Sequence, residues 1–518
     1  MEHRTPRAWA IRPTTAAVVP GDPDASLSGP LAPYRGPAVA DIPTHSRLLL
    51  DGRWEARGAH LPVVAPWSGE VLTEMALGTA GDVDRAVALA RVAVGRLGTA
   101  GERARVLDRT ADLLVRDREH LARIIASEAG KPWRAATLEV DRAVETLRFS
   151  AAEARTLGGA SIPMDAHPAG DGVLGFTLRE PIGVVAAITP FNFPLNLVAH
   201  KLGPALAAGC PVVLKPAEKT PLSALALVER MLEAGAPAQA VQVVTGTGPE
   251  VGAALAGHPD VDVVTFTGSA TVGHALKAAA APRAEVLLEL GSPAPLVVEA
   301  DADLDAVVPR IAAHGFGHAG QSCVSVQRVL VHDALADALV DRLAEQVGTL
   351  VVGDPLEPGT DVSCLIDETA AARVADWIAE AVAAGATVRV GGERDGATLS
   401  PTLVVDVPRD VRLWTEEVFG PVVAVTRFTT TDEAIAEIAG GPDLIQAGVF
   451  TASLDTALRY VRELRVGTVL VNESPTYRAD HMPYGGVGLA GNTREGPAAT
   501  VRELTREKLV LLRSGADR

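Results

Sequence analysis

Cysteine is scarce in this sequence. Its 518 residues contain three, Cys210, Cys323 and Cys364, and no two of them form a C-x-x-C pair. Such a set builds no disulfide framework, so a reducing compartment, the cytoplasm, is the predicted location. The histidines show no spacing typical of metal ligands, and no metal is expected. Cys210 and Cys364 are interpreted as small packing residues.

Long apolar runs and an excess of positive charge are missing as well. The longest apolar run, Leu202–Leu214, is interrupted by glycines and prolines. It falls short of the ~20 residues that cross a bilayer. With 64 acidic and 47 basic residues, the net charge is −17. We therefore expect neither a membrane nor a nucleic acid as the main partner.

Length and uneven composition divide the chain. Since a single hydrophobic core stops growing at roughly 250–300 residues, two or three packed units are expected. Residues 1–45 contain eight prolines and no apolar periodicity, which predicts a poorly ordered extension. Residues 48–54 predict a short strand and turn. Helical spacing follows over 82–97 with Asp82 as the N-cap, over 103–130 as one long helix, and over 139–156.

Between residues 183 and 290, short apolar runs alternate with helical segments. The expected strands are 183–188, 211–215, 241–244, 261–266 and 285–290. The expected helices are 195–208, 222–234, 249–256 and 270–280. This alternation is typical of a parallel sheet with helices on both faces. A second alternating region, from residue 328 to about 450, predicts another α/β unit, and residues 509–512 resemble an edge strand.

Polar residues and glycines follow the first set of strands where each strand ends. They are Asn192, Lys215, Gly246, Gly268, Ser269 and Glu289. Ligands of parallel sheets bind at the carboxyl ends of the strands, so these residues predict one active site.

The loop Ala319–Cys323 places one cysteine among small residues. Covalent chemistry on an aldehyde needs a thiolate nucleophile and a separate group that activates water, and Glu289 would be that group. In isolation, such a cysteine is more often structural. Asn192, stiffened by neighbouring prolines and aromatic residues, would be a rigid donor to an oxyanion, or an amide that satisfies the backbone of a turn.

Evidence for a nucleotide site is indirect. The G-x-G-x-x-G fingerprint is missing, so any dinucleotide must bind in an atypical manner. Gly268–Ser269 would offer free N–H groups to a pyrophosphate, or form an ordinary turn and N-cap. Lys215 and Glu218 would bind ribose hydroxyls, with Glu218 repelling a 2′-phosphate, or form a solvated pair. Glu416–Glu417 is by default a solvated acidic pair.

Taken together, these motifs resemble the aldehyde dehydrogenase superfamily over residues 46–513. The segments that carry the resemblance, in order, are Thr189–Pro194, Lys215–Glu218, Phe266–Gly273, Leu288–Gly291, Gly320–Cys323, Glu417–Pro421 and Pro483–Val487. The resemblance implies that Cys323 is the nucleophile, Glu289 the general base and Asn192 the oxyanion donor. The implied cofactor is NAD, with NADP as the alternative. Its expected contacts are Thr189, Pro190, Lys215, Glu218, Gly268, Ser269, Leu290, Glu417 and Phe419.

The resemblance also implies a fold and an assembly. We expect an α/β fold with a parallel-sheet cofactor domain (46–156 and 180–291) that binds its dinucleotide in an atypical Rossmann-like manner. A second α/β domain (292–484) would be catalytic. A small β arm with the tail (157–179 and 497–518) would build a homodimer or homotetramer.

The implied reaction is the NAD(P)-dependent oxidation of an aldehyde to a carboxylic acid. Cys323 would form a thiohemiacetal and then a thioester, hydrolysed by water that Glu289 activates. The alternatives are a CoA-acylating dehydrogenase, which Glu289 disfavours, and a catalytically retired binding protein. The chain departs from the family pattern at Gly488, where a lysine is common. Arg478 and His481 would face a polar or anionic aldehyde, or form surface ion pairs.

Overall fold

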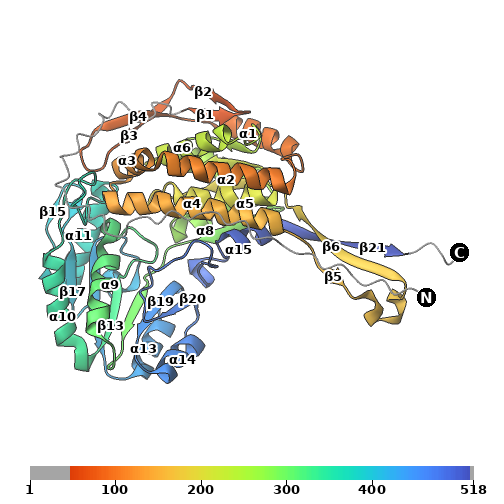
Figure 1. Ribbon diagram of the computed structural model, residues 1–518. Helices are drawn as coiled ribbons and strands as arrows, with labels where there is room; N and C mark the ends of the chain where they lie inside the picture. The colour runs from red at the N-terminus through yellow and green to blue at the C-terminus, as the bar shows by residue number, and fades with distance from the viewer. Residues whose placement is uncertain (1–46, 514–518) are drawn as a thin grey trace, which may run out of the picture. The chain divides into compact units, whose positions relative to one another are not determined.

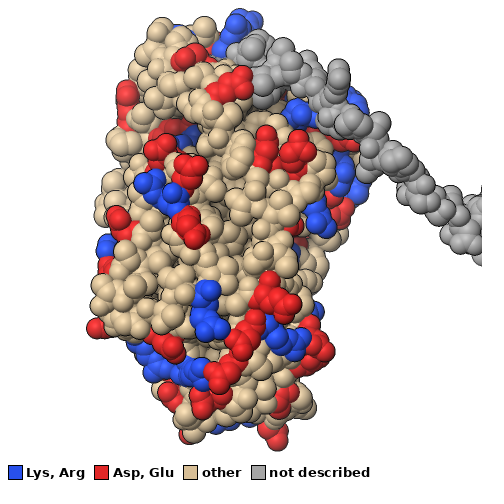
Figure 2. Space-filling view, turned by 90° about the vertical axis from the view of Figure 1, so that its left-hand side faces the viewer, with Lys and Arg blue, Asp and Glu red and all other residues tan. Residues whose placement is uncertain are grey.

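The computed structural model describes residues 47–513, and the extension expected over residues 1–45 lies outside the described residues. The expected α/β class is confirmed by two seven-stranded sheets with helices around them (Figure 1). On the face drawn in Figure 2, basic side chains lie among acidic ones. Among the described residues, no helix is long and apolar enough to cross a bilayer.

The first sheet has the strand order β11-β10-β7-β8-β9-β1-β2. Its parallel strands are β7 (Val185–Ile188), β8 (Val212–Lys215), β9 (Val241–Val243), β10 (Val263–Thr267) and β11 (Glu285–Glu289). The antiparallel edge consists of β1 (Leu48–Leu50) and β2 (Arg53–Glu55). Ile188 pairs with Lys215 and Thr267 with Glu289, so the strands end together at one edge.

Helices cover both faces of this sheet because its buried side chains alternate. Val185 and Ala187 face one helical layer, whereas Ala186 and Ile188 face the other. The first layer contains α2 (Ala100–Arg116), α3 (Arg118–Ala129), α4 (Trp133–Thr156), α5 (Asn196–Ala208) and α6 (Pro221–Glu233). The second contains α1 (Ala80–Ala93), α7 (Ala253–Gly257) and α8 (Ala270–Ala279).

Two helix boundaries differ from the expectation. Thr79, not Asp82, is the N-cap of α1. The Thr79 side chain accepts from the Asp82 N–H, and the Asp82 carboxylate accepts from the Thr79 N–H at 3.0 Å, which forms a capping box. The prediction of one continuous helix over 103–130 is also wrong. The segment forms two helices, α2 and α3, which meet at Asp117, where φ is −102° and ψ is 17°.

The second sheet has the strand order β14-β17-β18-β13-β12-β19-β20, and only β14 runs antiparallel to its neighbour. Its strands are β12 (Pro295–Val298), β13 (Arg328–His332), β14 (Thr387–Val390), β17 (Thr402–Val405), β18 (Val422–Phe428), β19 (Leu444–Phe450) and β20 (Val466–Val471). The helices of this region are α9 (Leu304–Phe316), α10 (Asp333–Gly348), α11 (Glu368–Ala383), α12 (Arg412–Thr415), α13 (Thr431–Ala439) and α14 (Leu454–Glu463). The expected second α/β region is therefore present.

A small antiparallel sheet joins distant parts of the chain. β6 (Val173–Pro181) pairs with β21 (Thr505–Arg513) along its whole length, and the two lie side by side in Figure 1. β5 (Ser161–Ile162) adds a short third strand. The helix that precedes β21 in the chain, α15 (Pro497–Glu503), packs against α4 and α5. Two hairpins complete the strands: β3 (His60–Val64) with β4 (Val71–Ala76), and β15 (Arg394–Asp395) with β16 (Thr398–Leu399).

Candidate active site

Cys323 lies in a strained loop between the short turn η5 (Gly317–Gly320) and β13. His318 and Ala319 both have φ of 51°, a conformation that non-glycine residues rarely adopt. Gly320 must be glycine, since a Cβ there would lie 1.9 Å from the carbonyl oxygen of Gly420. The backbone is thus fixed immediately before the candidate nucleophile.

Asn192 reaches this loop from the first sheet. It is buried in the connection between β7 and α5, and its Nδ2 donates to the Gln321 carbonyl at 2.9 Å. A side-chain amide carries two N–H donors, so one N–H serves the loop and the second remains for another acceptor. The structure therefore brings Asn192 to the segment that carries Cys323.

The Cys323 sulfur is partly buried and makes one hydrogen bond among residues 47–513. Its Sγ lies 2.8 Å from the hydroxyl of Tyr484. Burial raises the pKa of the Cys323 thiol to about 12; the Tyr484 hydrogen bond and Arg478 oppose this rise, and Glu417 and Glu289 add to it. The resting group at neutral pH is therefore a thiol that must lose a proton before it attacks.

Glu289 is the other candidate for the chemistry and lies at the end of β11. Both carboxylate oxygens are buried without a hydrogen-bond partner among the described residues. Burial, and next the nearby charge of Glu495, raise the pKa of Glu289 well above its ordinary value, against the pull of Arg478 and Lys201. A carboxylate with a raised pKa is a better proton acceptor than an ordinary one when it is ionised.

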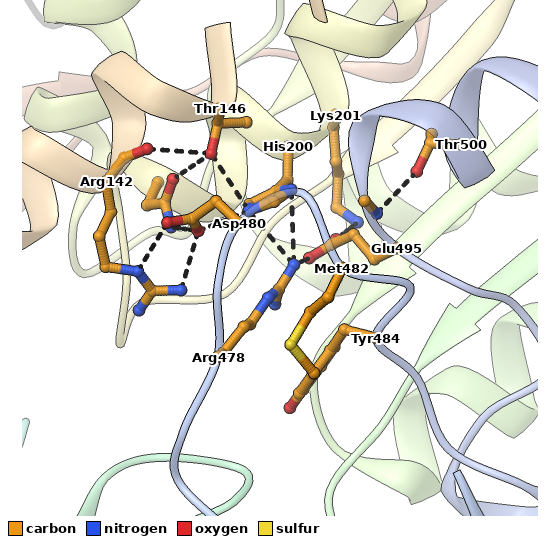
Figure 3. A network of polar contacts seen from close by, with 12 residues as sticks. Arg142, Thr146, His200, Lys201, Arg478, Asp480, Met482, Tyr484, Glu495 and Thr500 are labelled. Atoms are coloured by element: carbon orange, nitrogen blue, oxygen red, sulfur yellow. Dashed lines mark hydrogen bonds and ion pairs between the residues drawn. The ribbon is translucent and has the colours of Figure 1, made fainter. Parts of the chain in front are cut away.

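Behind these residues lies a buried network of charged side chains (Figure 3). Arg478 pairs with Glu495 at 2.8 Å, and its guanidinium carbon lies 4.0 Å from the centre of the Tyr484 ring. Lys201 lies 3.5 Å from the same Glu495 carboxylate. Although burial raises the pKa of Glu495, Arg478 and Lys201 hold it at about 2. Glu495 thus keeps its negative charge, and this charge helps to raise the pKa of the neighbouring Glu289.

The network continues away from Cys323 through a second carboxylate. Asp480 contacts His200 at 3.0 Å and Arg142 at 2.9 Å, and it accepts a hydrogen bond from Asn196. Burial and Arg478 lower the pKa of His200, so this imidazole is neutral at pH 7. The side chain of Arg478 is only 7% exposed, so surface ion pairing is the wrong explanation for it. His481 is exposed and lies against Phe149, with 5.0 Å between the ring centres.

The residues expected to hold a cofactor gather at the same edge of the first sheet. Thr189 follows β7, and its buried hydroxyl has no partner among the described residues, like that of Thr267 at the end of β10. Lys215 ends β8, where its ammonium bonds the Pro216 carbonyl at 3.0 Å and lies 3.5 Å from Glu218. Unpartnered hydroxyls beside a buried cation fit the polar groups of a dinucleotide.

Other expected cofactor positions border this edge. Ser269 caps α8 by accepting from the Val272 N–H at 3.4 Å, and the Gly268 N–H donates to the Glu289 carbonyl at 3.1 Å. Glu218 is 35% exposed and accepts from the Gly248 N–H. The remaining positions are Pro190 beside Thr189 and buried Leu290, which donates to the Ala490 carbonyl.

Glu417 is not the solvated side chain that its default interpretation assumes. One of its carboxylate oxygens is buried without a partner among the described residues, and a Cβ on Gly291 would lie 1.9 Å from the other. Burial raises its pKa to about 8, opposed by the Ser292 N–H and Arg373. Phe419, at φ 48°, meets Phe191 edge-on at 5.8 Å. Both therefore remain candidates for cofactor contact.

Sequence reasoning missed three residues that touch the site: Lys201, Tyr484 and Glu495. A signal existed for Lys201, since α5 is buried around its whole circumference and a charged residue there needs a partner. Cys210 and Cys364 are both buried. No group of His, Cys, Asp or Glu in the described range is arranged to hold a metal ion.

The family model of the aldehyde dehydrogenase family matches residues 54–510. The chain belongs to this family. It is 43% identical over 465 residues to the 3-sulfolactaldehyde dehydrogenase of Priestia megaterium, covering 90% of this chain and 97% of that one. The resemblance that the motifs indicated is thereby confirmed, and so is the enzyme class, an aldehyde dehydrogenase.

Solved structures agree. Aldehyde dehydrogenase 21 of Physcomitrella patens, in complex with the reaction product succinate, superposes with a TM-score of 0.87 at 34% identity, covering 91% of this chain and 99% of that one. The NADP-dependent glyceraldehyde-3-phosphate dehydrogenase of Bacillus halodurans, complexed with NADP, superposes with a TM-score of 0.87 at 37% identity. The match covers 90% of this chain and 99% of that one. This aldehyde dehydrogenase therefore uses NAD(P) to oxidise an aldehyde.

Proposed function

We propose that this enzyme oxidises its aldehyde to a free carboxylic acid, with Cys323 as nucleophile, Glu289 as general base and Asn192 as oxyanion donor. The observation that carries the proposal is the state of Glu289. Its carboxylate is buried and unpartnered among residues 47–513, and it is close enough to Cys323 to raise the pKa of that thiol. A base without a partner is suited to take a proton from water.

The first step forms the bond between sulfur and carbon. The Cys323 thiol releases its proton to water, the sulfur adds to the carbonyl carbon, and the carbonyl oxygen becomes an oxyanion. The free N–H of Asn192 would donate to that oxyanion, a contact typically worth about 2.7–4 kcal/mol. When bound, the oxidised nicotinamide supplies the acceptor for the hydride that then leaves the same carbon. The product of this step is a thioester on Cys323.

The second step breaks the carbon–sulfur bond. Glu289 takes a proton from water, the resulting hydroxide adds to the thioester carbon, and the sulfur leaves as a thiolate that regains a proton. The carboxylic acid is released. Because Glu289 acts only here, its loss should stop the enzyme at the thioester.

The cofactor would lie along the edge described above, held by Lys215, Glu218, Ser269, Glu417 and Phe419, with Thr189, Pro190, Gly268 and Leu290 beside it. The carboxylate of Glu218 disfavours a cofactor that carries a 2′-phosphate, so we propose NAD over NADP.

The substrate class that we propose is a small anionic aldehyde. Apart from the reacting Glu289, the network holds three cations, Arg142, Lys201 and Arg478, against two carboxylates, Asp480 and Glu495. The Nε of Arg478 is buried without a partner among the described residues. The relatives named above act on, or release, molecules with a sulfonate, a carboxylate or a phosphate.

A screen tests this function. The full chain is assayed with NAD and NADP on 4-oxobutanoate and on uncharged butanal, and the product is analysed after reaction in heavy-oxygen water. We expect faster turnover of the anionic aldehyde and at least one heavy oxygen in the acid, because hydrolysis of the thioester adds an oxygen atom from water. An acyl-CoA product upon addition of coenzyme A would favour the acylating alternative. A lack of reduced cofactor with any aldehyde would favour a retired binding protein.

We also propose a homodimer or homotetramer built through β6 and β21. The β21 side chains Leu509, Leu511 and Leu512 are exposed apolar groups on a long strand pair. Light scattering of the enzyme, with and without residues 505–518, tests this assembly.

A further inference from the structure

Tyr484 is the residue that holds the reacting sulfur. Its hydroxyl lies 2.8 Å from Cys323 Sγ. In the neutral pair either atom has a proton to donate, but an ionised sulfur has none and can only accept. Burial raises the pKa of Tyr484 well above its ordinary value, so the phenol keeps its proton. After Cys323 loses its proton, the hydrogen bond must therefore run from Tyr484 to the thiolate.

The ring of Tyr484 has little freedom to move away. The residue is 2% exposed, and the Arg478 guanidinium lies over its ring at 4.0 Å. Its backbone N–H donates to the Glu495 carbonyl at 2.8 Å, and its carbonyl accepts from the Glu495 N–H at 2.6 Å. Since Arg478 is itself paired with the Glu495 side chain, the same two residues fix the ring and the backbone.

We propose that Tyr484 is a further catalytic residue, whose hydroxyl donates to the Cys323 thiolate and stabilises it for attack, while Arg478 positions the ring. The proposal rests on the proposed role of Cys323 as the nucleophile. The site needs such a donor, because burial and, after it, the charges of Glu417 and of Glu289 on β11 raise the pKa of this thiol. A hydrogen bond to an ionised acceptor is roughly twice as strong as one between neutral groups.

The test removes only the hydroxyl. The rate of Cys323 alkylation by iodoacetamide is followed by peptide mass spectrometry from pH 6 to 9 in the wild type and in Tyr484→Phe. If the hydrogen bond lowers the thiol pKa by about one unit, its loss reduces the thiolate fraction about tenfold. The more basic thiolate regains about threefold in nucleophilicity, so we expect alkylation about threefold slower at each pH.

Tyr477→Phe is the matched control, because Tyr477 lies in the same segment but is 50% exposed. It should alkylate at the wild-type rate. Thermal unfolding of both variants shows whether they fold, and kcat is a second readout, which should be lower in Tyr484→Phe at each pH and unchanged in Tyr477→Phe. An alkylation rate in Tyr484→Phe equal to or above that of the wild type would overturn the proposal.

The two proposals fail separately. If Cys323→Ala still reduces cofactor with an aldehyde, the nucleophile assignment is wrong. If Cys323→Ala is inactive but Tyr484→Phe alkylates as fast as the wild type, only the role of Tyr484 is wrong.

Discussion

The side chain of Asn192 and the carbonyl of Gln321 are joined by a hydrogen bond of 2.9 Å. This contact links the connection after β7, in the first sheet, to the strained loop before β13, in the second. It positions the nucleophile loop and the proposed oxyanion donor relative to each other. One side chain therefore contributes both to the shape of the site and to its chemistry.

Replacing Asn192 should thus lower turnover strongly. Loss of one oxyanion donor typically costs about a hundredfold or more in kcat, so Asn192→Ala is expected to be slowed at least that much. Steady-state kinetics measures the loss, and circular dichroism shows whether the variant folds. A folded Asn192→Ala enzyme with more than a tenth of the wild-type kcat would contradict the proposed role.

The three cysteines provide an internal control for the nucleophile. Cys323→Ala should abolish formation of reduced cofactor, because no thioester can form. Cys210→Ala should retain activity, since Cys210 is buried away from the site. Its Sγ donates to the Leu504 carbonyl at 3.3 Å. Reduced cofactor is measured spectrophotometrically for both variants. Activity in the first variant, or its complete loss in the second, would point to a different nucleophile.

Much of the fold could be predicted because strand periodicity and helix punctuation are local signals. The continuous apolar run from Val184 to Ile188 indicates a strand that is covered on both faces, and the structure shows Val185 and Ala187 facing one helical layer and Ala186 the other. The break at Asp117 was missed because the apolar spacing continues across it and no glycine or proline marks it. The N-cap of α1 was misplaced because Thr79 and Asp82 bond each other reciprocally, and sequence alone favoured the aspartate.

Site residues could be predicted where their type and local position indicate their chemistry. They could not be predicted where they come from distant segments that only the fold brings together. Cys323, Glu289 and Asn192 stand out as reactive groups at strand ends or in an unusual loop. Tyr484 and Glu495 lie in a glycine-rich segment, and Lys201 lies on a buried helix. Only the fold brings these three together, so local composition could not identify Tyr484 and Glu495, and the buried helix around Lys201 indicates only that this residue needs a partner.

The pH dependence of turnover should report the raised pKa of Glu289. Glu289 must be ionised to accept a proton from water, and its pKa lies well above the ordinary value because of burial and then Glu495. Activity is therefore lost as pH falls through this raised pKa, at a higher pH than for an ordinary glutamate. Glu495→Gln removes the repulsion and should move the acid limb of kcat to lower pH. An unchanged or upward-shifted limb would count against this explanation.

Glu289→Gln should trap the enzyme after hydride transfer. Without the base, the thioester is hydrolysed slowly, so we expect a burst of about one reduced cofactor per active site and then little turnover. Intact-protein mass spectrometry should find the acyl group on Cys323. Steady turnover of the variant at the wild-type rate would show that another group activates water.

Arg478 should decide the preference for an anionic aldehyde. Its charge-assisted contact to a carboxylate is worth roughly 1.5–3 kcal/mol, so Arg478→Met should lower kcat/KM for 4-oxobutanoate by about tenfold or more. For butanal, which has the same chain length without the charge, the change should be much smaller. Arg462→Met, at an exposed position on α14, serves as the control. Equal losses for both aldehydes would mean that Arg478 supports the structure of the site and does not bind the substrate anion.

Glu218 should set the choice between the two cofactors. Its carboxylate accepts from the Gly248 N–H and lies 3.5 Å from the buried Lys215, at 35% exposure, where a ribose can reach it. Glu218→Ala removes the charge that repels a 2′-phosphate and leaves Lys215 free to attract one, so kcat/KM for NADP should rise about tenfold relative to NAD. Glu250→Ala, an exposed carboxylate just beyond Gly248, is the matched control and should leave the ratio as in the wild type. If both variants leave the ratio unchanged, Glu218 does not face the ribose, and the preference must come from another residue at this edge of the sheet.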